Sequence, residues 1–175
     1  MRKDPTRAER EFATAALVEL RAALALREKL LSPGSPAPAE TIELIGRAEL
    51  AHGDIPAARL SLERALQIRQ AALPPTCLEV ARSLRWLGEA RLAADEATEA
   101  ADLLGRATIS LAAGGAEAPE LSGARFALAR ALAGAGQAAT AVKTAREARL
   151  ILQALGTAWQ RETAEIDTWL ASHPG

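Results

Sequence analysis

A repeated pattern of small and apolar residues constrains the fold of this chain more than any other sequence feature. The pattern returns after 42 residues and again after a further 41. Its three copies are Ile45-Gly46 with Ala58, Leu62 and Ala65; Leu87-Gly88 with Ala100, Leu104 and Ala107; and Leu128-Ala129 with Ala141, Ala145 and Ala148. A period of this length is typical of repeat architectures, in which each repeat is one supersecondary unit.

The second half of the pattern also occurs upstream of the first full copy. Leu62, Ala65, Leu66, Ile68 and Arg69 correspond to Leu20, Ala23, Leu24, Leu26 and Arg27. Segments rich in Pro and Gly separate the copies, at 33–36, 74–75 and 114–119. The chain is therefore expected to contain three full repeats preceded by half of another.

Each repeat is predicted to consist of two helices. The apolar residues follow helical spacing, and Ala, the strongest helix former, occupies 43 positions. The predicted helices are 7–31, 38–52, 55–73, 77–94, 96–113, 118–135, 137–155 and 157–171. One helix pair cannot bury its apolar face alone, so the pairs are expected to stack side by side.

We therefore expect a single all-α domain over residues 1–175. Its predicted parts are a half repeat (7–35), three repeats (36–75, 76–116 and 117–156) and a capping helix (157–172). Trp159, Ile166, Trp169 and Leu170 share one face of that last helix, as expected for a cap on a repeat array.

Local signals predict how some helices begin and end. Gly53 and Gly136 are expected to form left-handed turns between paired helices. Thr76, with Glu79 three residues later, predicts a capping box at the start of the 77–94 helix.

The run Ile45-Gly46, Gly53, Ile55, Ala58, Leu62 and Ala65 resembles the tetratricopeptide repeat (TPR) signature. The family's usual repeat has 34 residues, and the longer period here is closer to the kinesin-light-chain-like subtype. Ala-Leu-Gln-Ile-Arg at 65–69 and Ala-Leu-Ala-Leu-Arg at 23–27 resemble that subtype's second helix. The third repeat is degenerate, since Ala129, Ala138 and Ala145 replace the expected Gly and larger apolar residues.

The resemblance implies a right-handed superhelical stack of antiparallel helix pairs, or α-solenoid, with about 3.5 repeats. The opening helix is then a second helix without its partner, as if the chain were cut from a longer array. Such arrays are similar to the tails of bacterial serine/threonine kinases and other signalling proteins. No kinase motif occurs in this sequence.

In the family, the first helix of each pair lines a concave groove that binds partner proteins. The positions that match are Glu40, Glu43 and Arg47 in the first repeat, Arg82, Arg85 and Glu89 in the second, and Phe126 and Arg130 in the third. Helical spacing adds Trp86 beside this stripe. Because the chain has no Asn to clamp a ligand backbone, recognition would depend on charge and shape.

An aromatic residue flanked by two arginines can anchor a partner, because Trp and Arg dominate interface energetics. One interpretation is that Arg82, Arg85 and Trp86 hold a peptide or protein segment with acidic residues. The other is that Trp86 packs against the preceding helix while the arginines pair with Glu43 or Glu89.

Charge and hydropathy exclude several other classes of partner. The net charge of −1, from 21 basic and 22 acidic residues, provides no concentrated basic surface for nucleic acid or an anionic membrane. Neither a signal peptide nor a membrane-spanning apolar run is visible, so the cytoplasm is the expected compartment. The excess of Ala and Arg suggests a GC-rich bacterial genome.

Catalytic and metal-binding chemistry has little support in the sequence. His52 is expected near a helix end, His173 lies next to the C-terminus, and Cys77, the single cysteine, has no His close to it in sequence. We expect no catalytic site, no metal and no cofactor.

Two kinds of function remain. The first is an adaptor that binds a partner in the groove. The second is a structural or oligomerising segment, or a regulatory tail docking on another domain, with self-association through the 7–31 helix as one form. Cover over Phe12, Leu17, Leu20 and Leu24 together with an open groove would favour the adaptor, and exposure of these residues would favour self-association or a missing neighbour.

Overall fold

The computed structural model describes residues 7–32 and 34–174, and side chains from residue 14 onward. The described residues form helices and turns without a strand. The helices are α1 (Arg7–Leu30), α2 (Ala37–His52), α3 (Ile55–Ala72), α4 (Leu78–Ala93), α5 (Ala97–Ala113), α6 (Ala118–Gly134), α7 (Ala138–Ala154) and α8 (Gln160–Ser172), with a 3₁₀ turn, η1 (Thr157–Trp159), before α8. The all-α prediction is confirmed, and α1–α7 begin and end within one residue of their predicted bounds.

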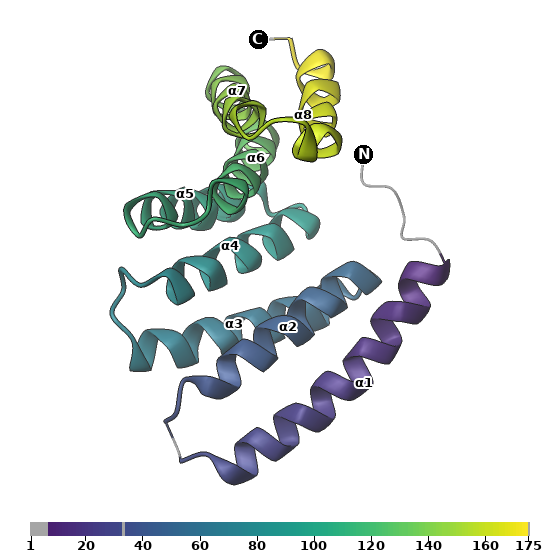
Figure 1. Ribbon diagram of the computed structural model, residues 1–175, viewed down its shortest axis with the longest axis vertical. Helices are drawn as coiled ribbons and strands as arrows, with labels where there is room; N and C mark the ends of the chain where they lie inside the picture. Colours follow the sequence, from purple (N-terminus) through teal and green to yellow (C-terminus); the bar gives the residue numbers. More distant parts are fainter. Residues whose placement is uncertain (1–6, 33, 175) are drawn as a thin grey trace.

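Three antiparallel helix pairs stack along the molecule, namely α2–α3, α4–α5 and α6–α7 (Figure 1). We call the first helix of each pair the A helix and the second the B helix. By its sequence, α1 is a B-type helix, and it packs against α2 at one end of the stack. At the other end, α8 packs against α7.

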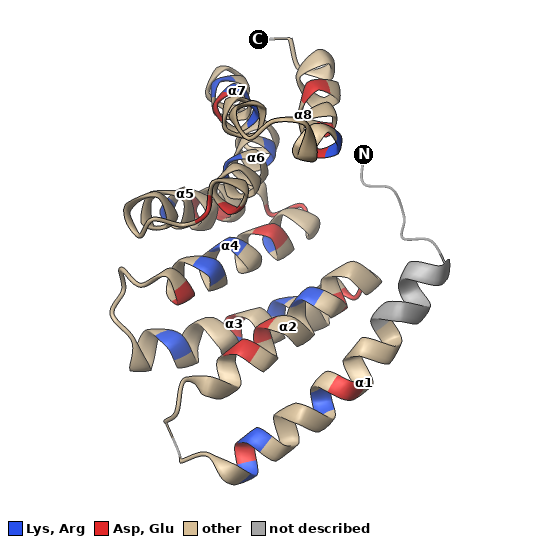
Figure 2. Cartoon of the chain, in the orientation of Figure 1, with Lys and Arg blue, Asp and Glu red and all other residues tan. Residues whose placement is uncertain are grey.

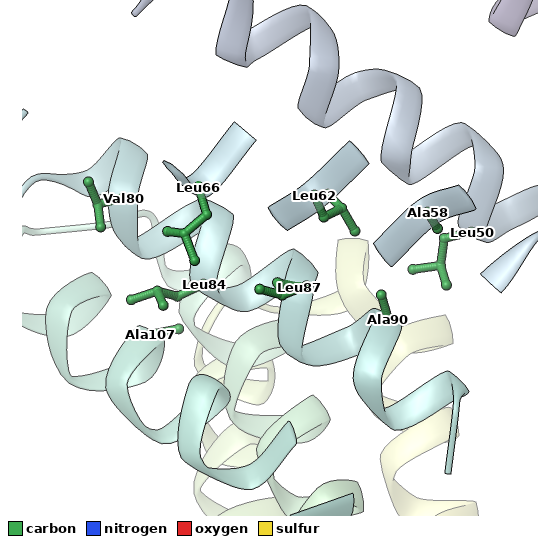
Figure 3. Close-up of a cluster of buried hydrophobic side chains, with 9 residues drawn as sticks. All are labelled: Leu50, Ala58, Leu62, Leu66, Val80, Leu84, Leu87, Ala90 and Ala107. Atoms are coloured by element: carbon green, nitrogen blue, oxygen red, sulfur yellow. The ribbon is translucent and has the colours of Figure 1, made fainter. Parts of the chain in front are cut away.

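The apolar core runs from one pair into the next. Around the α3–α4 boundary, Leu62 and Leu66 of α3 lie together with Leu84 and Leu87 of α4 (Figure 3). All four side chains are buried. Because neighbouring pairs share this core, no pair is an independent folding unit, as expected for a repeat array.

The last helix covers the exposed side of the third pair. Ile166 of α8 is buried against Ala145, Ala148 and Leu152 of α7. Trp159, Trp169 and Leu170 pack around the same cluster, so the four apolar residues predicted to share a face do so.

The start of α4 differs from the prediction. The capping box of Thr76 and Glu79 is wrong, because the helix begins at Leu78 and its N-cap is Cys77, whose side chain makes no capping hydrogen bond. Hydrogen bonds from the backbone N–H of Glu79 and from the Cys77 thiol lower the pKa of Glu79. The turn that starts at Pro74 places Thr76 one residue too early to cap the helix.

The closest contact within a helix pair involves a small residue of the A helix. A Cβ atom on Gly46 would lie 2.6 Å from Cγ of Leu62, and one on Gly88 would lie 2.7 Å from Cγ of Leu104. In the third pair the corresponding residues are Ala129 and Ala145, both fully buried. The third repeat thus exchanges a Gly–Leu contact for a smaller Ala–Ala contact.

This contact predicts opposite effects for two glycine substitutions. Gly88→Ala should lower the free energy of unfolding by about 1–3 kcal/mol, because the new methyl group overlaps Leu104. Gly105→Ala, in the interior of α5, meets nothing within 4 Å and should raise it by about 0.5–1 kcal/mol through helix propensity. Urea unfolding of both variants measures the difference, and equal effects would contradict the close contact.

The turns between A and B helices need one residue in the left-handed conformation. Gly53 (φ 94°) and Gly136 (φ 78°) fill this position, as predicted. In the second pair the residue is Asp95, with φ 61°. A side chain there strains the backbone, although Asp tolerates this conformation better than most residues.

We therefore expect Asp95→Gly to stabilise the protein by about 0.5–1 kcal/mol, because Gly adopts this conformation without a Cβ penalty. The thermal midpoint measured by circular dichroism would rise. The reverse change at an equivalent turn, Gly53→Asp, should lower it, and a fall in both variants would contradict the strain argument.

Candidate binding surface on the A helices

Trp86 lies at the centre of a cluster of arginine side chains contributed by two A helices. The guanidinium carbon of Arg47, from α2, lies 4.2 Å from the centroid of the Trp86 ring. That of Arg85, from α4, lies 4.8 Å from it. Trp86 is half-buried and packs against the α3–α4 core, so the ring is held in place. We call Arg47, Arg85 and Trp86 the tryptophan cluster.

Carboxylates hold two arginines of α4. Arg85 donates to Glu89 at 3.0 Å, one helical turn away, as one of the two interpretations of the sequence predicted. Arg82 donates through Nε and Nη2 to both carboxylate oxygens of Glu120 in α6, at 2.8 and 3.0 Å. These hydrogen bonds lower the pKa of Glu120 and raise that of Arg82. The Arg82–Glu120 pair therefore joins two neighbouring A helices.

Glu120 was not anticipated from the sequence, because it lies 38 residues from Arg82. The signal that could have revealed it is periodic. Each A helix carries an acidic residue in its first turn, namely Glu40, Glu79 and Glu120. Glu120 pairs with the preceding A helix, whereas Glu40 pairs with Arg27 of α1, so this signal by itself does not identify the partner.

Arg47 differs from the other two arginines. It is exposed, and among the described residues its only identified interaction is the contact with Trp86. Its N–H donors thus remain available to an incoming acceptor, while the ring fixes the position of the guanidinium group. Figure 2 shows that α4 carries both basic and acidic residues along its length.

Glu43 does not belong to this surface. It was predicted to line the groove, but its exposure is only 6%, and it forms an ion pair with Arg69 of α3. Ser83 of α4 donates to Glu43 at 3.1 Å, and Arg69 donates to Ser83 Oγ at 2.7 Å and to the Glu79 carbonyl at 2.9 Å. Three helices thus enclose the carboxylate, which helical spacing along α2 alone could not predict.

The same clamp exists in a simpler form one repeat earlier. Arg27 donates to Thr41 Oγ1 at 2.7 Å and to the Ala37 carbonyl at 3.3 Å, which are the counterparts of Ser83 and Glu79. Arg27 also pairs with Glu40 at 3.2 Å, so the predicted groove residue Glu40 is exposed but engaged. Leu111 and Leu152 take the position of the arginine in later repeats, where both are buried.

The buried ion pair predicts a strong dependence of stability on Arg69. Arg69→Leu should cost about 3–5 kcal/mol, because it leaves the Glu43 carboxylate buried without its cation. Glu43→Leu combined with Arg69→Leu should recover most of that loss, since apolar residues often replace buried ion pairs without cost.

Arg27→Leu is the matched control, because its exposed pair with Glu40 should contribute about 1 kcal/mol or less. Chemical denaturation measures all three variants. A double variant as unstable as Arg69→Leu alone would show that packing, and not the unpaired charge, causes the loss.

Phe126 and Arg130 occupy the third A helix, away from the tryptophan cluster. Phe126 packs edge-to-face on Trp169 of α8, with ring centroids 6.0 Å apart, and His173 stacks on Trp169 at 4.0 Å. Arg130 is exposed. The structure thus separates the predicted site residues into a charged region on α2 and α4 and an aromatic region where α6 meets α8.

Two open pockets lie between α1 and α3, and residues of α2 form part of their lining. One, of about 330 Å³, is lined by Glu28, Leu31, Pro38, Arg64 and Ile68, among others. The other, of about 260 Å³, lies over Ile42 and Ile45. Glu28 and Arg64 form an ion pair at 2.6 Å. Both pockets are shallow gaps between helices and carry no convergent set of reactive groups.

The described residues present little catalytic or metal-binding chemistry. They contain no group of three or more His, Cys, Asp and Glu side chains placed to hold a metal ion. His52 is half-buried near the end of α2, and Cys77 is a half-buried free thiol at the start of α4. No helix among these residues has the length and hydropathy needed to cross a bilayer.

Comparison with known proteins identifies the fold. No family model and no curated protein sequence matches this chain. Among solved structures, it is similar to a Podosopora anserina protein described as a kinesin light chain with nearly identical TPR-like repeats. The TM-score is 0.67 at 21% identity, and the alignment covers 95% of this chain and 93% of the other. A single-substitution variant of that protein matches with a TM-score of 0.68 at 20% identity, over 95% and 92% of the two chains. This chain therefore has the fold of TPR-like repeat proteins, as its sequence predicted.

Proposed function

We propose that this chain is a non-catalytic protein-interaction module whose A-helix surface binds a peptide or protein segment carrying acidic residues. The observation that supports this most directly is the tryptophan cluster. Arg47 holds an exposed guanidinium group over Trp86 without a carboxylate of its own. A second arginine, Arg85, contacts the same ring.

The chemistry of the cluster suits an acidic ligand. A guanidinium group offers a fixed fork of N–H donors that can bind a carboxylate through two hydrogen bonds. Trp86 supplies apolar area beside it, and Trp and Arg are the residues that most often dominate interface energetics. Arg82 and Arg85 are already neutralised by Glu120 and Glu89, so Arg47 is the arginine best placed to pair with a ligand.

The source organism and the cellular role of the protein are also part of the proposal. The excess of Ala and Arg suggests a bacterium, and the TPR resemblance suggests a signalling adaptor in the cytoplasm or part of a larger signalling protein. Docking on another domain or self-association through α1 is the second candidate, because Val18, Leu26 and Leu30 of α1 are exposed.

Selection of displayed random peptides on the immobilised protein tests the main proposal. We expect the selected peptides to be enriched in Asp and Glu. Arg47→Glu should weaken their binding at least tenfold, about 1.4 kcal/mol, because it places a carboxylate where the ligand's carboxylate would lie. Fluorescence anisotropy with one labelled peptide measures the change.

The matched control is Arg146→Glu, which makes the same charge change on the exposed side of α7. This variant should bind the peptides as the wild type does. Equal weakening in both variants would mean that only net charge matters. Binding that Arg47→Glu leaves unchanged would show that the peptides bind elsewhere.

A further inference from the structure

The B helices repeat a contact motif that is buried three times and uncovered once. In α3, α5 and α7 the motif is Ala58, Leu62 and Ala65; Ala100, Leu104 and Ala107; and Ala141, Ala145 and Ala148, and all nine side chains have 0% exposure. The corresponding residues of α1 are Ala16, Leu20 and Ala23. Ala16 and Leu20 are only half-buried, and Ala23 is exposed.

The A helix of the same pair covers part of each motif, and the next helix along the stack covers the rest, since Ala100 and Leu104 also cluster with Ala127 and Ala131 of α6. Gly46 of α2 lies against Leu62, and Gly88 of α4 lies against Leu104. Among the described residues, no helix lies against this face of α1 as Gly46 and Gly88 lie against their leucines, and α1 packs on α2 through its other face. Leu17 is buried and Leu24 packs against Ile42 of α2, just as Leu66 packs with Leu84 one repeat later.

These contacts show which of the apolar α1 residues named from the sequence are covered. Leu17 is buried and Leu20 and Leu24 are partly covered, whereas the side chain of Phe12 lies outside the described residues. The uncovered apolar residues are different ones. Leu26 and Leu30 are exposed by 60% and 81%, and Ala23 lies on the same side of α1. Val18, exposed by 63%, lies on another side. Glu19 and Arg27 are the charged residues within this face.

We propose that this face, defined by Ala16, Leu20, Ala23, Leu26 and Leu30 and called the α1 acceptor face, binds an amphipathic helix of another polypeptide. That helix packs on α1 as α2 packs on α3, and it carries Gly opposite Leu20. The proposal concerns a different surface from the tryptophan cluster and does not depend on the function proposed for that cluster.

The geometry of the repeat defines the chemistry of the bound helix. Leu20 corresponds to Leu62, against which even the Cβ of an alanine would lie only 2.6 Å from Cγ. A helix with a large residue at this point could not approach closely. Arg27 lies on this face near the C-terminal end of α1, and its counterpart Arg69 pairs with Glu43 of the A helix of its own pair, so an acidic residue suits the bound helix at that point.

A second copy of the chain fits this face poorly. A symmetric dimer would place the B-type faces of two α1 helices together, and neither face carries a Gly such as those that receive the leucine in the first two pairs. The A helices that do carry a small residue, α2, α4 and α6, are already packed against their own B helices. The far end of the array offers no second apolar face either, because the exposed residues of α8 include Arg161, Glu162, Glu165 and Asp167.

The A helix of the first repeat supplies the probe. A fluorescent peptide of residues 36–54 contains α2 with both of its ends and is titrated into the full chain. We expect saturable binding, and at least tenfold weaker binding of the same peptide with Gly46→Leu. Equal binding of the two peptides would overturn the proposal.

Variants of the protein locate the binding site. Leu26→Glu with Leu30→Glu changes two exposed residues, so the fold should be retained, and it should weaken peptide binding at least tenfold. Ile109→Glu, on an equally exposed residue of α5, should leave it unchanged. Peptide that instead replaces α2 on α3 would not respond to the α1 changes, and that result would overturn the proposal. Arg47→Glu should bind this peptide normally, which separates the outcome from that of the tryptophan cluster.

Because a short isolated helix is marginally stable in water, a second measurement does not depend on peptide affinity. Residues 36–54 are fused ahead of residue 7, and hydrogen exchange of 14–30 is compared with that of the unfused chain. We expect at least tenfold slower exchange, and no such change for the Gly46→Leu fusion. Unaltered exchange in both fusions would overturn the proposal. So would a dimer of the unfused chain that Leu26→Glu dissociates, since the occupant would then be a second copy.

Discussion

The close approach of two helices within each pair is the constraint on which the rest of the structure depends. At Gly46 and Gly88 the A helix has no side chain, and a leucine of the B helix fills the space. This contact sets the distance between the paired helices. The apolar faces left over then match those of the next pair, so that the core continues through the stack. If the paired helices moved apart, the surfaces used for stacking would no longer align.

Polar contacts distinguish one junction between pairs from another. Arg21 of α1 pairs with Glu49 of α2 at 3.1 Å, whereas the residues one repeat later, Glu63 and Arg91, pair at 2.6 Å with the charges reversed. At the third junction the corresponding residues are Gly105 and Leu132, which carry no charge. If α4 took the place of α2 beside α1, Arg21 would meet Arg91. If a copy of α2 took the place of α4 beside α3, Glu63 would meet Glu49. Like charges at these positions disfavour incorrect orders of the helix pairs.

The helices and their pairing could be predicted because they depend on local periodicity. Small residues at a fixed spacing identify both partners of a close helix contact, even where Ala129 and Ala145 replace Gly and Leu. The candidate site was less predictable, because it depends on residues far apart in the sequence. Glu43 shares a stripe with Arg47 along α2, yet Arg69 and Ser83 from two other helices enclose it. The ion pair of Arg82 with Glu120 and the contact of Arg47 with Trp86 likewise require the stacked arrangement. The predicted capping box was wrong for a local reason, since the turn that starts at Pro74 extends to Cys77 and α4 begins one residue later than predicted.

The different sizes of the paired contact residues in the third repeat and in the first two also limit how the gene can change. Gly on one helix is matched by Leu on the other, and Ala is matched by Ala, so a helix pair carries a complementary set of two residues. Recombination in the turn between the two helices would join Ala129 to a leucine, which overlaps, or Gly88 to an alanine, which leaves a void. Recombination in the Pro- and Gly-rich segments between pairs keeps each set together. Duplication or loss of whole pairs is thus the form of length variation that this core tolerates best.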